Sequence, residues 1–239
     1  MINVFDPLVA LGLLTLASTD PSSICQLPKP VEIKVLPKTE PVKYDFTQTR
    51  AELQKYDIDT INPYGFDANS HTNGFMRGLI KMQPFVKLDY KGVYNNRAVC
   101  IWYETIELNI EIRPEIVIAK EIAEDPCRFK AVKQHELKHV MVDRKIVNKY
   151  AKTMGKKVFT GLKSRGFVVG PVAVENAEAV VKRMQDTVGQ LVELEYKKMG
   201  IERAEKQQEV DSLEEYEYVN SKCTGTRTNA SRRRSSNRR

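Results

Sequence analysis

Two histidines and a glutamate near the middle of the chain have the types and the spacing of a metal-hydrolysis site. The segment His135-Glu136-Leu-Lys-His139 sets two imidazoles four residues apart, so on a helix both project from one side, one turn apart. At that separation both can reach one zinc ion at about 2.0–2.1 Å. Glu136 can take a proton from the attacking water while the ion polarises a carbonyl. The pattern predicts a zinc hydrolase, and among hydrolases a peptidase.

A catalytic zinc site needs a third protein ligand, which the spacing leaves open. Asp143 continues the four-residue series but lies about 6 Å beyond His139 along a helix axis, so we expect it to hold an imidazole N–H instead. His71 can be a ligand, a donor to the oxyanion or a plain surface histidine. The other candidates are acids of a second predicted helix, most of which must be solvated: Glu175, Glu178, Glu195, Glu202, Glu205, Asp211, Glu214 and Glu215.

The motif lies on a predicted helix that runs from about Cys127 to Tyr150 or beyond. Asp125 is the expected N-cap, and Pro126 the first helical residue. Apolar residues recur at spacings of three and four along this segment, which places both histidines on the apolar face. The motif is therefore expected to face the interior.

A second helix is predicted from about Val172, after a break marked by Gly166 and Gly170-Pro171. It is expected to falter at Gly200. Two long helices joined by a short loop should pack antiparallel, which would bring the acids of the second helix towards the first.

The N-terminal half is rich in strand patterns. We predict strands, a short helix at 47–58 and a long loop at 60–76; the strands are 31–36, 42–46, 79–82, 85–88, 98–103, 106–112 and 116–119. Strands that follow one another without intervening helices favour a mostly antiparallel sheet. The predicted fold class is α+β, with a mostly antiparallel N-terminal sheet followed by a long C-terminal helical pair.

The net charge of +7 is concentrated at the C-terminus. Residues 224–239 hold six arginines and no acid, so the rest of the chain carries only +1. We therefore expect no nucleic-acid binding by the folded body. The arginine-rich tail, which cannot fold alone, can contact anionic surfaces or act only as a solubilising terminus.

The N-terminus and the cysteines favour export. Residues 8–17 form an uncharged apolar run, as long as a signal-peptide core and too short to cross a membrane. No lysine or arginine precedes the run, so a buried N-terminal helix is the alternative. Cysteines 25, 100, 127 and 223 lack CxxC spacing and suit two disulfides as well as free thiols. Together these features predict a periplasmic or secreted protein.

The chain is similar to an uncharacterised family of bacterial exported proteins described as secreted zinc-dependent proteases. The resemblance covers about residues 25–223, and it is carried by Asn62–Gly65, Cys100, Pro126-Cys127, His135–Asp143, Asp211–Tyr216 and Cys223. More distantly, such a helix beneath a sheet resembles the zincins, in which the edge strand holds an extended peptide and a downstream acid or histidine completes the metal site. The expected organisation is a signal peptide and linker at 1–24, a zincin-like metallopeptidase domain at 25–223 and a disordered tail at 224–239.

The resemblance also implies roles for individual residues. His135 and His139 would be zinc ligands and Glu136 the general base, acting on a peptide or protein substrate. The segment that includes Glu215 would return to the site, with Glu215 as third ligand. The matching cysteines imply a Cys100–Cys127 bridge, which leaves the other two cysteines, at 25 and 223, as a second pair. The alternative function is a non-catalytic cell-envelope interaction protein, with the helical pair as its binding element and a structural or vestigial metal site.

Overall fold

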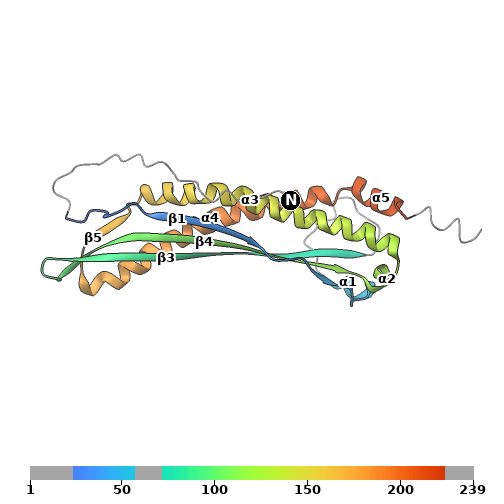
Figure 1. Ribbon diagram of the computed structural model, residues 1–239, viewed down its shortest axis with the longest axis horizontal. Coiled ribbons are helices and arrows are strands. Elements are labelled where there is room, and N and C mark those ends of the chain that lie inside the picture. The colour runs from blue at the N-terminus through green and yellow to red at the C-terminus, as the bar shows by residue number, and fades with distance from the viewer. Residues whose placement is uncertain (1–23, 57–71, 224–239) are drawn as a thin grey trace, which may run out of the picture.

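Residues 24–56 and 72–223 are described by a computed structural model, as an elongated sheet with two long helices along one face (Figure 1). The predictions for the signal peptide, for most of the loop that carries His71 and for the arginine-rich tail lie outside these residues. The elements are β1 (Glu32–Thr39), β2 (Lys43–Asp45), α1 (Arg50–Leu53), β3 (Gly74–Val93), β4 (Ala98–Ile118), α2 (Lys120–Ala123), α3 (Pro126–Lys163), β5 (Val168–Ala173), the 3-10 turn η1 (Val174–Asn176), α4 (Ala177–Val210) and α5 (Leu213–Ser221).

Two strands of 20 and 21 residues, β3 and β4, form most of the sheet. The sequence predicted them as five shorter strands, but the gaps between the predicted strands also stay extended, including 104–105 and 113–115 of β4. In β4 the inward-facing Ile106, Leu108, Ile110 and Ile112 are almost fully buried, and the residues between them are more exposed. The hairpin turns only at 94–96, where three successive residues have positive φ.

Strand β4 is the centre of the sheet. β3 pairs antiparallel with its whole length, and along the other side of β4 lie β5, then β1, then β2. β5 is antiparallel to β4, whereas β1 and β2 are parallel to it. The sheet is therefore mixed, and the prediction of a mostly antiparallel sheet is corrected at β1 and β2. Both are joined to β4 through long chain segments, which remove the hairpin constraint.

Two prolines of the long strands, Pro84 and Pro114, lie where no ladder hydrogen bond is lost. Pro84 belongs to β3, whose only pairing among the described strands is with β4, so β3 is an edge strand. Pro114 lies in central β4, but β1 pairs only as far as Ile112 and β2 begins at Glu115. The missing N–H of Pro114 therefore falls in the gap between β1 and β2.

Helix α3 begins where the sequence predicts, and its whole length is 38 residues. The Asp125 carboxylate accepts hydrogen bonds from the backbone N–H groups of Cys127 and Arg128, and Pro126 is the first helical residue. The face of α3 that contacts the sheet is buried along its whole length, from Val132 to Leu162. The predicted apolar face, with both histidines within it, is confirmed.

Helix α4 packs antiparallel to α3, as predicted. Lys157 binds Glu195 and Lys149 binds Glu202, so residue numbers rise along one helix as they fall along the other. Two details differ from the sequence prediction: the residues before α4 form strand β5, and α4 continues through Gly200 to its end at Val210.

Two disulfides join the ends of the described chain to its interior, and their pairing corrects the Cys100–Cys127 expectation. The bonds are Cys25–Cys100 and Cys127–Cys223. Strand β4 carries the chain from Cys100 to Ile118, about 60 Å at ~3.3 Å per residue, whereas bridged Cα atoms lie about 6 Å apart. Cys100 and Cys127 therefore belong to opposite ends of the molecule.

The disulfides indicate an oxidising environment, such as the periplasm or the extracellular space. None of the helices in residues 24–56 and 72–223 combines the length and the apolar character needed to cross a bilayer.

The Cys127–Cys223 bond is expected to hold α5 in place. None of the nine residues of α5 is buried, so little apolar packing secures this helix against α3. The paired Cys127→Ser/Cys223→Ser substitution should therefore speed amide hydrogen exchange throughout 212–223. As the matched control, Cys25→Ser/Cys100→Ser removes a bond of similar sequence separation at the other end of the molecule and should leave exchange in α5 unchanged. Equal protection of α5 in all three proteins would contradict this assignment.

Candidate metal centre

Three buried side chains meet where α3 passes the end of α4. His135 and His139 lie one turn apart on α3, and Asp211 is the residue at which α4 ends. The Asp211 Oδ1 atom is 3.2 Å from the Nε2 atom of each histidine, and the two Nε2 atoms are 3.4 Å apart. These side chains form a compact group that can hold a metal ion.

The spacing of these atoms fits a small four-coordinate cation. Bonds of about 2.0–2.1 Å in tetrahedral directions place neighbouring ligand atoms about 3.3–3.4 Å apart. The three separations of 3.2, 3.2 and 3.4 Å lie close to that value. Three donors occupy three corners of a tetrahedron, which leaves the fourth corner for another ligand.

Asp211 takes the place that the sequence-based prediction gave to Glu215. The Glu215 Oε1 atom lies 3.5 Å from Nδ1 of His135, the ring nitrogen that faces away from Asp211, and Oε2 binds Lys138 Nζ at 2.6 Å. The prediction of Glu215 as third ligand is therefore corrected. Glu215 instead lies behind His135, where its charge favours a proton on Nδ1 and leaves Nε2 to bind an ion.

The electrostatics of the cluster follow from burial and from close opposite charges. Burial alone would raise the pKa of Asp211, but hydrogen bonds and charge interactions with both histidines hold it well below its usual range. Burial alone would lower the pKa of His139, but the contacts with Asp211 and Glu136 raise it above its ordinary value. In the absence of a cation the Asp211 carboxylate therefore stays ionised and stabilises a proton on His139.

Glu136 is buried beside the same group, only 3% exposed. Burial raises the pKa of its carboxyl group, an effect opposed by the neighbouring His135 and His139. The backbone N–H of Met76 in β3 donates a hydrogen bond to the Glu136 carboxylate. The motif glutamate therefore lies between the metal-binding group and the edge strand of the sheet.

Tyr216 is a neighbour of the cluster that sequence reasoning did not single out. Its hydroxyl donates a hydrogen bond of 3.3 Å to Asp211 Oδ1, and its ring centre is 5.7 Å from that of His135. Burial, reinforced by the Asp211 charge, raises the pKa of this phenol, which therefore stays protonated. Its position in α5, five residues after Asp211, is the sequence signal that could have identified it.

Asp143 does not touch either imidazole, which corrects the expectation that it holds one directly. Gln207 of α4 lies between: its Oε1 is 2.6 Å from His139 Nδ1, and its Nε2 is 2.7 Å from Asp143 Oδ1. Arg203 completes the group by binding both oxygens of the Asp143 carboxylate, at 2.6 and 3.2 Å. Sequence reasoning missed Gln207 and Arg203.

Among the described residues, the other predicted candidates do not join the cluster. His71 lies outside the described residues. Glu195 and Glu202 bind lysines further along α3, and four glutamates are exposed, as expected of solvated surface charges: Glu175, Glu178, Glu205 and Glu214.

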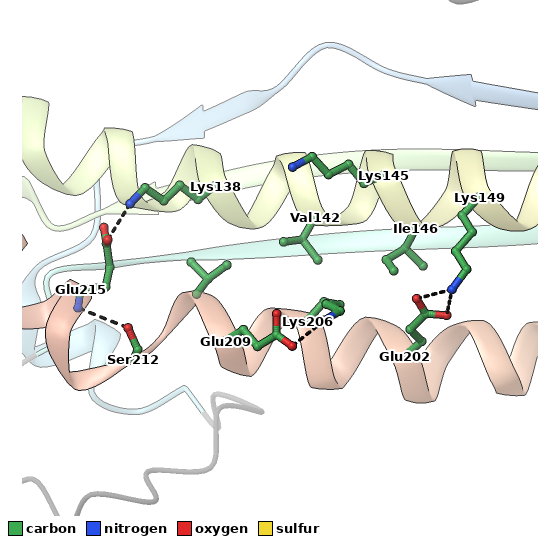
Figure 2. Close-up of a pocket in the computed structure, with 11 residues that line it drawn as sticks. Lys138, Val142, Lys145, Ile146, Lys149, Glu202, Lys206, Glu209, Ser212 and Glu215 are labelled. Atoms are coloured by element: carbon green, nitrogen blue, oxygen red, sulfur yellow. Dashed lines mark hydrogen bonds and ion pairs between the residues drawn. The ribbon is translucent and has the colours of Figure 1, made fainter.

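A groove of about 550 Å³ runs between α3 and α4 beside this centre (Figure 2). Val142 and Ile146 line it together with ion pairs such as Lys149–Glu202. At one end lies the Lys138–Glu215 pair, but none of the three metal-binding residues lines the groove. It therefore adjoins the outer side of His135, not the side that faces Asp211.

Gly78 of β3 makes the close approach of the sheet to this centre possible. A Cβ atom at Gly78 would lie 2.7 Å from Asp143 Oδ2, and Asp143 is fully buried and held by Arg203 and Gln207. Gly78→Ala should therefore lower the free energy of unfolding by about 1–3 kcal/mol in chemical denaturation. Gly189→Ala in α4, where a Cβ atom meets nothing within 4 Å, is the control and should raise stability by up to about 1 kcal/mol. Equal stability of the Gly78→Ala variant and the wild type would contradict this account.

Comparison of the chain with protein-family models, with curated proteins and with solved structures gives no match in any of the three.

Proposed function

We propose that the protein is an exported zinc-dependent hydrolase that cleaves peptide bonds. The observation that carries the proposal is the buried group of His135, His139 and Asp211, with Glu136 beside it. The two disulfides of the described chain suit an exported protein.

The donor set favours zinc over the common alkaline-earth ions. Calcium and magnesium prefer shells made of oxygen, whereas two imidazoles and one carboxylate are typical ligands of catalytic zinc. Three protein ligands with a vacant fourth position are the pattern of catalytic zinc sites. Zinc bound there supplies a Lewis acid, which polarises a carbonyl group and lowers the pKa of a water molecule.

Glu136 is the proposed general base. Burial raises its pKa towards the working range of a base that must gain and release a proton in each cycle. The Met76 N–H fixes the orientation of its carboxylate. Tyr216 keeps its proton and lies beside Asp211, so its hydroxyl is the proposed donor to the oxygen that becomes negative during the reaction.

A peptide substrate is supported by the edge strand. Backbone groups of alternate residues in a strand point to the same side, so those of Gly78 share the open edge of β3 with the N–H of Met76 and the C=O of Ile80. Met76 bonds to Glu136, and the Ile80 carbonyl accepts the Tyr196 hydroxyl at 2.7 Å. An extended peptide paired between these two points would pass beside the general base.

A non-catalytic envelope protein with a structural metal is the second candidate. It is favoured by the burial of all three ligands, each less than 9% exposed. A structural site is closed by a fourth protein ligand, whereas a catalytic site keeps that position for water or substrate. The variants described in the next two paragraphs distinguish a catalytic from a structural metal site.

Metal content tests the ligand set. The wild-type protein should contain one zinc per chain by elemental analysis, and His139→Ala or Asp211→Ala should lose it because two donors hold zinc poorly. Glu215→Gln should keep one zinc per chain with an affinity lowered roughly 10–100-fold, because only the orientation of His135 is loosened. Loss of zinc from Glu215→Gln but not from Asp211→Ala would restore Glu215 as the ligand.

Activity tests the general base. Glu136→Gln should keep its zinc and lose roughly 100–10,000-fold in the cleavage rate of an unstructured protein such as labelled casein, because the amide cannot accept the proton. The conservative control Glu195→Gln removes a buried carboxylate that binds Lys157 and Lys198, and should retain full activity. An unaltered rate in the Glu136→Gln variant would favour the structural-metal alternative.

A further inference from the structure

Four side chains form a line of contacts that leads from the candidate metal centre into the interface between α3 and α4. His139 contacts Gln207, Gln207 contacts Asp143, and Asp143 contacts Arg203. His139 and Asp143 are one turn apart on α3, and Arg203 and Gln207 are one turn apart on antiparallel α4. Two adjacent turns of each helix therefore supply the whole line.

The Asp143 end of this line fixes the direction of the Gln207 amide. A carboxylate paired with a guanidinium only accepts hydrogen bonds, so the amide must present its NH₂ group to Asp143. Gln207 Nε2 does so at 2.7 Å and also donates to the His139 carbonyl oxygen at 3.2 Å. The amide oxygen is thereby turned towards the imidazole.

The direction of the amide in turn fixes the tautomer of His139. An amide oxygen only accepts, so the hydrogen bond of 2.6 Å requires a proton on Nδ1 of His139. A neutral imidazole has a single N–H, so a proton on Nδ1 leaves the lone pair on Nε2, the atom that faces Asp211 and His135. In the metal-free protein the Asp211 carboxylate, 3.2 Å from Nε2, favours the opposite tautomer, so the Gln207 oxygen shifts the balance towards the Nδ1–H form. In the other tautomer a proton would occupy the position of the metal bond.

We propose that Asp143, Gln207 and Arg203 are positioning residues that select the metal-binding tautomer of His139. The metal-binding role rests on the proposed function; the tautomer does not. Asp143 is fully buried, and neither it nor Arg203 contacts the three metal-binding side chains through any hydrogen bond or ion pair described here. Its effect passes through the Gln207 amide.

His135 has no comparably short hydrogen bond at Nδ1 to fix its tautomer. Its Nδ1 lies 3.5 Å from Glu215, which is beyond the usual length of a hydrogen bond. Glu215 is bound at the same time to Lys138, whose side chain is 46% exposed. The tautomer of His139 is therefore set by a tighter arrangement than that of His135.

The tautomer of His139 can be read directly in the metal-free protein. Long-range ¹⁵N–¹H NMR at alkaline pH, where the imidazole is neutral, distinguishes Nδ1–H from Nε2–H. The wild type should show a substantial share of the Nδ1–H form, although the Asp211 carboxylate accepts from Nε2. Asp143→Asn keeps the shape but replaces one of the two acceptor oxygens by an NH₂ group and removes the charge that binds Arg203, so the direction of the Gln207 amide is held less firmly and the share of the Nε2–H form should rise. The zinc affinity of this variant, measured by competition with a chromophoric chelator, should fall roughly tenfold.

A matched control and a second variant show whether a change of tautomer comes from Asp143 and Gln207 themselves. Glu195→Gln also neutralises a buried carboxylate of the α3–α4 interface and should change neither the tautomer nor the zinc affinity. Gln207→Met keeps the side-chain volume but removes all three hydrogen bonds of the Gln207 amide, so it should also raise the share of the Nε2–H form even if Asp143→Asn fails to fold.

An Nδ1–H share in the Asp143 and Gln207 variants equal to that of the wild type, with unchanged zinc affinity, would overturn the proposal. This result is separable from the proposed function, because the tautomer is measured without metal or substrate. Failure of the wild-type protein to cleave peptides would contradict the proposed hydrolase function. It would not affect the measured tautomer of His139.

Discussion

The antiparallel register of α3 against α4 is the constraint on which the site depends. Stepping one turn at a time along both helices joins three pairs: Asp143 with Arg203, His139 with Gln207, and His135 with Asp211. A slip of one turn would displace the partners by about 5.4 Å and carry Asp211 away from both imidazoles. The apolar core shared by the two helices, which includes Val158 of α3 and Met199 of α4, fixes this register. The same packing therefore also brings the candidate metal centre together.

The part of the site that lies on one helix was predictable, and the part that crosses between helices was not. His135, Glu136 and His139 follow from spacing alone, because the helix fixes their relative positions. Asp211 and Glu215 both reach His135, but from opposite sides of its ring, and the sequence does not say which side faces the other histidine. Knowing one interhelical pair would have identified the rest by counting turns.

The fold divides in the same way. Periodicity predicted the α+β class and the two long helices, because it is a local property. Two features join residues that are far apart in the sequence: the parallel pairing of β1 and β2 with β4, and the two disulfides. The predictions of the sheet type and of the cysteine pairing were wrong for one reason, which is that β4 was predicted as several short strands. β4 is a single strand long enough to separate its ends by most of the molecule (Figure 1).

The Cys127–Cys223 bond links the surroundings of the candidate centre to the redox state of its compartment. His135 and His139 are set as soon as α3 forms, but Asp211 belongs to a stretch whose far end is fixed covalently to the first turn of α3. That link forms only where thiols are oxidised. In a reducing compartment the packing of α3 against α4 still brings Asp211 to the histidine pair, but α5, which carries Glu215 and Tyr216 and has no buried residue, lacks its covalent link to α3. The surroundings of the candidate centre are thus coupled to where the chain resides.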